Sequence, residues 1–548
     1  MLEKVFSKIF YFATLPTKTV EGAAAVLAAS ILLSRILGLI RYRLLAAEFG
    51  DRLILLDSFL AASIVPEIIF EVLIFGSISV AFIPIFSQLL ARGQKERAWQ
   101  LARTLVGLGL VLFCIFAAVL ILTADKVGFL VAPGLVSKSV ETEQLIGNLI
   151  RVMVISQLFF LFGIFATSIL QSYQNFLVPA LAPAVYNLGI IFGIVALSSR
   201  FGIFGPALGM IIGSFAFFVI QLVAILKFGS LFGGQFKFPK PDVLKVTRLA
   251  WPRVVGLAAA RGIDWINIAL ASLTGAGSIV AFNFAQTLAA VPIGLFGSSV
   301  AQAALPTLSA QFAKNDLVNF KKTFILAVQQ IFFFTLPTVS ILAILRVPAV
   351  RLVFGAGNFP WETTLLAGRV LIILSVAIIA QAMLLLLVRA FYALEDAKTP
   401  IVLGLASFSV NVILAVVLIL LLKLPVTFLA AAFTLSNLLY AASLFYFLNK
   451  RVGGFDWGRL IIPIVKMGIA AGMSALIVYI PFKVLDFVLN TSKTLNVLIL
   501  SLASGSSGLL TYFILNLIFG VHQAKMIHNF FSRLKFPKKI LSVEIFKG

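Results

Sequence analysis

The chain has 548 residues, of which 61% are hydrophobic and 11% are charged, and its mean hydropathy is +1.11. A soluble domain is about 45–50% apolar and about 25% charged, so this composition excludes a water-soluble fold and makes the bilayer the solvent. The net charge is +23, but Lys and Arg lie mostly in short segments between apolar runs, where they act as topology signals. We therefore expect no nucleic-acid partner.

The single cysteine, Cys114, lies inside an apolar run. One cysteine excludes a disulfide framework and a thiolate metal site. The N-terminus has no small-residue cleavage site after a short apolar core, so we expect no removable signal peptide.

Apolar runs of about 18 residues or more predict spanning helices. We find about fourteen such runs, which predicts an all-α polytopic membrane protein. They lie near 21–40, 54–90, 101–124, 143–170, 177–198, 205–228, 244–273, 278–312, 321–346, 364–393, 400–422, 425–448, 459–489 and 494–520. Gly76 and Pro84 are expected to break the second run, and Pro292 and Pro306 the eighth, which membranes tolerate only where the backbone faces protein or a water-filled cavity.

Basic segments alternate with loops that are poor in charge, which predicts that both termini are cytoplasmic. The basic segments contain Lys4, Lys8 and Lys18; Arg92, Lys95, Arg97 and Arg103; Lys227, Lys237, Lys240, Lys245 and Arg248; Lys314, Lys321 and Lys322; Lys450, Arg451 and Arg459; and Lys525, Arg533, Lys535, Lys538 and Lys539. The exception is the first loop, where Arg41, Arg43 and Arg52 fall on the predicted outer side.

The two halves of the chain contain similar segments in the same predicted orientation. Residues 81–87 followed by Ala91-Arg92 resemble residues 303–309 followed by Ala313-Lys314. Asn187 and Asn411 follow at nearly the same offset of roughly 220 residues, which predicts a parallel internal repeat. Repeats of this kind place the substrate site between the halves, near the bilayer midplane.

Ionisable groups inside spanning segments are costly and usually face a cavity, so these residues are the first candidates for function. A guanidinium binds two phosphate oxygens at once, and Arg35 and Arg41 at the end of the first span are suited to a phosphate or diphosphate. Two alternatives stay open: Arg35 forms a structural ion pair with Asp57 or Glu67, or Arg41 extends to lipid headgroups.

Two acids of the second run, Glu67 and Glu71, lie one helical turn apart and share a face. They either take up protons or balance the arginines. Farther along, Asp264, Asn411 and Thr434 are polar residues within spans and offer oxygen ligands to a small cation such as sodium. The alternative for Asn411 and Thr434 is hydrogen bonding between helices.

The chain has no Walker loop, no Ser-His-Asp set and no metal-ligand cluster, so we expect a transporter rather than an enzyme. It should need no bound cofactor and use sodium ions or protons as the coupling ion.

Several motifs resemble the MurJ (MviN) family of lipid II flippases. They are Ser34 to Arg41, then Phe49-Gly50, Asp57 and Pro66; Pro179 to Pro183 with Asn187; Leu352 to Gly355 with Asn358-Phe359; and Ala390 to Pro400. This resemblance implies the fold of the MOP exporter superfamily, with two six-helix lobes forming a V around a cationic cavity and two further helices forming a groove for the polyprenyl tail. The implied parts are 1–235, 236–450, 451–521 and a basic cytoplasmic tail, 522–548, suited to anionic membrane lipids.

The resemblance further implies that a monomer in the bacterial inner membrane moves lipid II from the cytoplasmic to the periplasmic leaflet by alternating access. It implies cavity positions for Arg35, Arg41 and Asp57, and a sodium site at Asp264, Asn411 and Thr434. The chain departs from the family where arginines are usual, with Phe70 and Glu71 in one place and Gln286 and Thr287 in another, and with Phe75-Gly76-Ser77 and Ala415 elsewhere.

These departures leave alternatives open. The chain either carries lipid II or another polyprenyl-diphosphate-linked glycan, or it is a cation-coupled multidrug exporter of the same superfamily. A membrane scaffold that recruits cell-wall enzymes is a further possibility.

Overall fold

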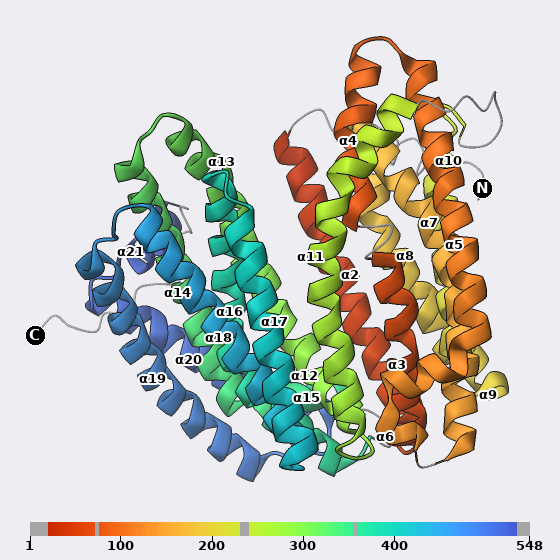
Figure 1. The fold of residues 1–548 in the computed structure, drawn as a ribbon. Coiled ribbons are helices and arrows are strands. Elements are labelled where there is room, and N and C mark those ends of the chain that lie inside the picture. The colour runs from red at the N-terminus through yellow and green to blue at the C-terminus, as the bar shows by residue number, and fades with distance from the viewer. Residues whose placement is uncertain are drawn as a thin grey trace, which may run out of the picture. The chain divides into compact units, whose positions relative to one another are not determined.

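The computed structural model describes residues 20–71, 76–137, 139–230, 240–355, 357 and 359–533, and every regular element among them is a helix (Figure 1). Eleven of these helices are long and apolar enough to cross a membrane, so the expected all-α polytopic fold is confirmed. The other predicted spans fall on α2 (Val20–Phe49), on α3 (Leu53–Phe70) with α4 (Gly76–Ala91), and on α11 (Lys240–Ser272). The count of fourteen spans stays a prediction.

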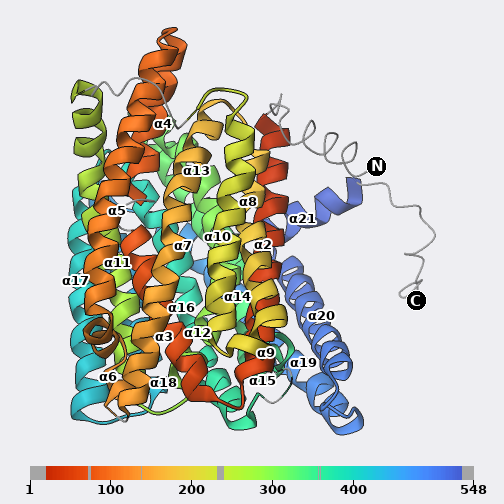
Figure 2. The same ribbon diagram turned by 90° about the vertical axis from the view of Figure 1, so that its right-hand side faces the viewer.

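The chain divides into two compact units, and α12, α15, α16, α17 and α18 contribute to both. Unit 1 comprises residues 1–284, 353–367 and 408–429. Besides α2, α3, α4 and α11 it contains α5 (Lys95–Val131), α6 (Pro133–Val136), α7 (Val140–Ser172), α8 (Leu177–Phe192), η2 (Gly193–Leu197), α9 (Ser198–Phe201) and α10 (Phe204–Ile225). Within it, α7 packs between α5 and α10 (Figure 2).

Unit 2 comprises residues 285–352, 368–407 and 430–548. Its helices are α12 (Ser278–Pro292), η3 (Ile293–Ser298), α13 (Ser299–Ala313), α14 (Leu317–Ile344), α15 (Arg346–Phe354), α16 (Trp361–Ala393), α17 (Lys398–Val416), α18 (Val426–Arg451), α19 (Trp457–Val488), α20 (Thr494–Ile518) and α21 (His522–Arg533), of which α12, α15, α16, α17 and α18 extend partly into unit 1. The π-helix η4 (Val417–Leu421), which continues α17, lies wholly in unit 1. The lobe boundaries expected from the sequence stay a prediction.

Large aromatic side chains form the core of unit 1 where α4, α5 and α7 meet. Phe82 and Phe86 of α4 are fully buried, and their rings contact Phe165 of α7 and Trp99 of α5 edge-on at centroid distances of 6.0 Å each. Edge-to-face pairs of this kind add about 0.5–1.5 kcal/mol beyond the burial of area. These rings therefore fix how α4 packs on its neighbours.

Glycines let α8, η2 and α10 pack backbone against backbone. A Cβ atom added at Gly189 would lie 2.2 Å from the Cα of Gly213, and one added at Gly209 would lie 2.8 Å from the carbonyl oxygen of Gly189. Helices in membranes associate through such seams of small residues, because lipid gives them little hydrophobic driving force.

The internal repeat has a signature in the backbone. Residues with left-handed φ end helices in corresponding places of the two halves: Gly93 and Asn315, Gln174 and Glu395, Gly202 and Lys423. The π-helices η2 and η4 begin at Gly193 and Val417, the sixth residue after Asn187 and after Asn411. Equivalent helices of the two halves thus start, kink and stop in the same manner.

Two of the four expected helix breaks are wrong. Pro84 lies inside α4 and Pro306 lies inside α13, and both helices continue through the proline. A proline removes one backbone hydrogen bond, and neighbouring groups in a bundle compensate for the loss. Pro292 does interrupt its helix, because η3 follows it directly. The break expected at Gly76 adjoins residues 72–75, which lie outside the described residues, and it stays a prediction.

Asp396, in the loop before α17, caps the N-terminus of that helix. Asp396 accepts a hydrogen bond from the Thr399 backbone amide at 3.0 Å and one from its hydroxyl at 2.7 Å. Pro400 falls in the first helical turn, where its missing N–H does no harm. The sequence from Asp396 to Pro400 is therefore accounted for by its role in starting helix α17.

Replacing Gly209 by Ala should destabilise the protein by about 1–3 kcal/mol, because the added methyl meets backbone atoms that cannot move aside. The measurement is thermal unfolding of the purified protein in detergent. Gly472→Ala in α19 is the matched control, since no atom lies within 4 Å of its added Cβ and Ala should there stabilise the helix by about 0.5–1 kcal/mol. Equal melting temperatures would contradict the glycine seam.

Asp396→Ala should cost about 1 kcal/mol at neutral pH, as loss of an N-cap usually does. The hydrogen bond from the Thr399 amide is the main reason why the pKa of Asp396 lies below its usual range. Stabilisation by a carboxylate with a lowered pKa is present above the unfolded pKa of about 4 and lost as the pH falls through the folded pKa. The difference in melting temperature should therefore shrink on acidification, whereas Asp396→Asn should show no such pH dependence relative to Asp396→Ala.

Candidate functional site

A hydrogen-bonded asparagine fixes the turn of α2 that carries Arg35. The Nδ2 of Asn187, on α8, donates to the backbone carbonyl of Ser34 at 3.2 Å and to its hydroxyl at 3.3 Å. Arg35 itself is exposed and makes no hydrogen bond or ion pair with a described residue. The helix is thus held on one side while a guanidinium projects from another.

Arg41 is placed by aromatic side chains. Its guanidinium carbon lies 4.6 Å from the centroid of the Tyr42 ring, and the Tyr42 ring contacts Phe284 and Phe354 edge-on. The Nε of Arg41 is buried without a hydrogen-bond partner among the described residues. Cation–π contact holds the guanidinium but leaves this donor unused.

The end of α2 rests on the segment before α16. A Cβ atom at Gly50 would lie 2.8 Å from the Cα of Phe359, and Gly357 adopts a φ of +59° with its added Cβ 2.7 Å from the Ala47 carbonyl oxygen. Only glycine allows such close approach with that backbone conformation. This segment is therefore a support for α2 and not a nucleotide loop.

Arg261 of α11 is neutralised by two carboxylates. It bonds to Glu71, just after α3, and to Asp264 at 2.9 Å. Its side chain is 40% exposed and those of Glu71 and Asp264 are 29% and 32% exposed, so this cluster is only partly buried by protein. Glu67, one turn before Glu71, is exposed and lies within electrostatic range of both Arg41 and Arg261.

The structure thus brings together Arg41, Glu67, Glu71 and Asp264, with Arg261 at the centre. The alternative in which Arg35 pairs with Asp57 or Glu67 is not what the described residues show. The cluster contains three carboxylates and two guanidinium groups, so its acidic groups outnumber its basic ones. Arg35 is the nearby arginine along α2 that no described carboxylate engages.

Asp57 lies apart from this cluster, fully buried at the turn between α11 and α12. Its two carboxylate oxygens accept hydrogen bonds from the backbone amides of Gly277, at 2.6 Å, and Val280, at 2.8 Å. A carboxylate at the start of a helix satisfies amides that have no partner within the helix. These contacts give Asp57 a structural task, and its assignment to substrate binding stays a prediction.

Each of the proposed sodium ligands has different contacts. Asp264 is bonded to Arg261, and a neighbouring guanidinium repels a cation. Asn411 is buried in α17, and the hydroxyl of Thr434 donates to the Ile373 carbonyl oxygen at 3.2 Å. Among the described residues, no three His, Cys, Asp or Glu side chains gather closely enough to hold a metal ion. The sodium site stays a prediction.

A family model described as lipid II flippase MurJ matches residues 45–498. The chain belongs to the MurJ family. A probable lipid II flippase MurJ of Bdellovibrio bacteriovorus is 29% identical over 405 residues, 73% of this chain and 77% of the relative. The corresponding protein of Rhizobium meliloti is 26% identical over 86% of this chain and 88% of its own length, and a lipid II flippase MurJ of Burkholderia cenocepacia is 26% identical over 68% and 72%.

The solved structure of a lipid II flippase MurJ in an inward closed conformation superposes with a TM-score of 0.74 at 25% identity, covering 90% of this chain and 98% of that one. A multidrug MATE transporter of the MOP superfamily, in an inward-facing conformation, gives a TM-score of 0.66 at 14% identity over 79% and 98%. The second likeness shows a shared fold alone. The MurJ family and the MOP superfamily fold expected from the motifs are both confirmed.

Sequence reasoning did not identify Arg261 of α11 as the partner of Glu71, 190 positions earlier. One feature of the sequence could have indicated this pair. Glu71 stands where the resemblance to the MurJ family leads us to expect an arginine, and an additional acid inside a membrane requires a counter-charge. Tyr42 was missed entirely, since an aromatic residue beside an arginine is too common to single out.

Asp57→Ala should destabilise the protein by about 2–4 kcal/mol, because it leaves two buried amides without acceptors. Thermal unfolding in detergent measures the loss. Asp57→Asn keeps one acceptor and should lose less, and Asp51→Ala, which removes an exposed ion pair with Arg52, should lose at most about 1 kcal/mol. A variant Asp57→Ala that melts like the parent but fails to transport would instead support a substrate contact.

Proposed function

We propose that this chain is a flippase that moves lipid II, the lipid-linked peptidoglycan precursor, from the cytoplasmic to the periplasmic leaflet of the bacterial inner membrane by alternating access. Membership of the MurJ family over residues 45–498 supports the substrate class. The proposal depends on two arginine side chains of α2. Arg35 is exposed and forms no ion pair with a described residue, and the Nε of Arg41 is a buried donor without a hydrogen-bond partner among the described residues.

These two guanidiniums are the diphosphate anchors in this proposal. A diphosphate offers paired oxygens to the planar donors of arginine, and the guanidinium stays charged in a low-dielectric site. Arg261 is a poorer anchor, because Glu71 and Asp264 already occupy it. The family's usual arginines are replaced in this chain, so α2 carries a larger share of the binding.

The carboxylates act as counter-ions in the same site. Without substrate, Glu67 and its neighbours offset the positive charge of Arg41 and Arg261. When a diphosphate binds Arg41, Glu67 faces a second anion, and protonation removes that repulsion. The cluster therefore supports a proton as the coupling ion more than sodium, for which Asp264 is a poor ligand while it binds Arg261.

The proposal also covers topology. Both termini face the cytoplasm, as the alternation of basic loops indicates, and the protein works as a monomer in contact with membrane lipids.

Arg35→Glu and Arg41→Glu should each abolish complementation of a strain depleted of its own flippase, and lipid II should accumulate in the cytoplasmic leaflet. Each charge-assisted hydrogen bond is worth about 1.5–3 kcal/mol, so flipping should fall at least about tenfold. Arg35→Lys should retain intermediate activity, since it keeps the charge and loses the fork. Arg200→Glu, at an exposed position in α9 and outside the basic topology segments, is the control and should complement.

The measurement is accessibility of lipid II from the periplasmic side, with protein amount and insertion checked in the membrane fraction. Full activity of well-inserted Arg35→Glu and Arg41→Glu variants would overturn the assignment of the anchors. Failure of the unmodified chain to flip lipid II would point instead to another polyprenyl-linked glycan.

A further inference from the structure

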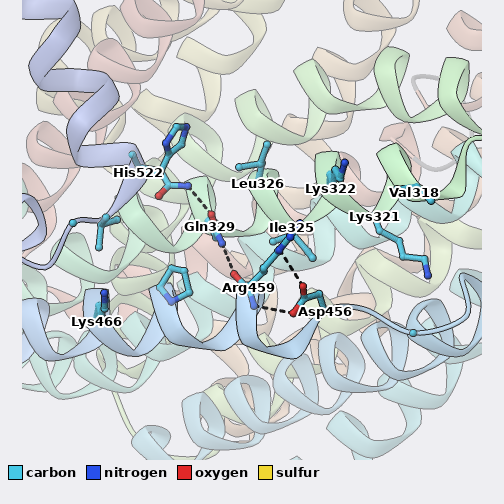
Figure 3. Close-up of a pocket in the computed structure, with 15 residues that line it drawn as sticks. Val318, Lys321, Lys322, Ile325, Leu326, Gln329, Asp456, Arg459, Lys466 and His522 are labelled. Atoms are coloured by element: carbon cyan, nitrogen blue, oxygen red, sulfur yellow. Dashed lines mark hydrogen bonds and ion pairs between the residues drawn. The ribbon is translucent and has the colours of Figure 1, made fainter.

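Unit 2 contains a pocket of about 620 Å³ at the end where the starts of α14 and α19 meet the turn between α20 and α21 (Figure 3). A cavity of this size is in the range of small-ligand sites, about 300–1,000 Å³. None of its residues belongs to the cluster around Arg261. It therefore offers a second site with chemistry of its own.

Hydrogen bonds between buried side chains hold the walls of the pocket together. The Nε2 of Gln523, on α21, donates to the Oε1 of Gln329, on α14, at 2.9 Å. The Nε2 of Gln329 donates in turn to the backbone carbonyl of Arg459, on α19, at 2.7 Å. Gly520, with a φ of +70°, turns the chain into α21, and Val521 is buried against the same helices. Three helices are thus locked in place around the opening.

Four cationic side chains line the pocket, with one carboxylate to offset them. Lys321 and Lys322 project from α14, and Arg459 and Lys466 from α19 (Figure 3). Asp456 pairs with Arg459 at 3.1 Å. The other three cations form no ion pair with a described carboxylate. Lys466 donates to the Phe519 carbonyl oxygen at 2.9 Å, and Lys321 donates to the Gly453 carbonyl oxygen at 3.3 Å. Lys322 makes no hydrogen bond or ion pair with a described residue.

The rest of the lining is apolar. Val318, Ile325 and Leu326 of α14 lie between the lysines, and Pro463 and Val521 complete the wall. A soluble phosphate would use the cations and gain nothing from these carbon surfaces. An amphiphile with an anionic head would use both, because its acyl chains bury apolar area while its phosphate pairs with ammonium groups.

We propose that this pocket binds an anionic glycerophospholipid, with its phosphodiester at Lys321 and Lys322 and the first part of its acyl chains along Val318 and Leu326. Such a lipid would join α14, α19 and α21 and steady the end of unit 2. A zwitterionic lipid brings its own ammonium group into a cationic site and is disfavoured. The pocket shares no residue with the diphosphate anchors on α2, so the proposal is independent of what the protein flips.

Native mass spectrometry of the delipidated full chain tests the proposal, with phosphatidylglycerol and phosphatidylcholine added in turn. The phosphatidylglycerol adduct should bind more tightly. The double variant Lys321→Gln, Lys322→Gln should lose roughly thirtyfold in its affinity for phosphatidylglycerol, since each lysine near an anionic lipid contributes about 1 kcal/mol. Lys314→Gln, Lys450→Gln is the matched control, because both lysines are exposed on neighbouring turns but do not line the pocket; its affinity should be unchanged.

Three results would overturn the proposal: equal affinity for the two lipids, equal loss in the control variant, or displacement of the lipid by millimolar inorganic phosphate. Stronger binding of lipid II than of phosphatidylglycerol at these lysines would reassign the pocket to the substrate. A photoreactive phosphatidylglycerol on the unmodified chain provides the check that does not depend on variant folding. Its cross-links should map to α14, α19 and α21, and labelling elsewhere alone would contradict the site.

Discussion

A charge inside a bilayer must be paired or reached by water, and this requirement organises α2, α3 and α11. Arg261 satisfies it by pairing with Glu71 and Asp264. Arg41 satisfies it partly, through the Tyr42 ring and the nearby Glu67. Arg35 satisfies it by exposure. The three arginines thus range from fully paired to unpaired, and their availability to an incoming anion increases in the same order.

Several contacts hold helix α2 in place beside this cluster. Asn187 holds Ser34, an aromatic group holds Tyr42, and close backbone contact holds Gly50. Long arginine side chains lose much conformational entropy when they bind, so a rigid helix beneath them limits the additional loss. Ser34 and Tyr42 of α2, Gly50 just after it and the segment before α16 therefore act through position: their contacts fix the helix that carries Arg35 and Arg41.

Much of the fold follows from the sequence because a membrane reduces the choices. Apolar length gives the helices, and the repeat at Asn187 and Asn411 reappears as paired π-helices in the backbone. The expected breaks at Pro84 and Pro306 failed because a bundle can supply the lost hydrogen bond from elsewhere, which no local rule detects. The site was predicted residue by residue but not pair by pair. Glu71 and Arg261 meet across 190 positions, and only the packed helices bring them together.

The replaced arginines change how a diphosphate would be held. Here Glu67, Glu71 and Asp264 reduce the net charge around Arg261, so binding at Arg41 must compete with Glu67. That competition weakens the ground state, and a transporter gains from it, because a carrier that binds too tightly in one orientation cannot let go in the other. Under the proposed function, the acids of this chain would therefore favour turnover at the expense of affinity.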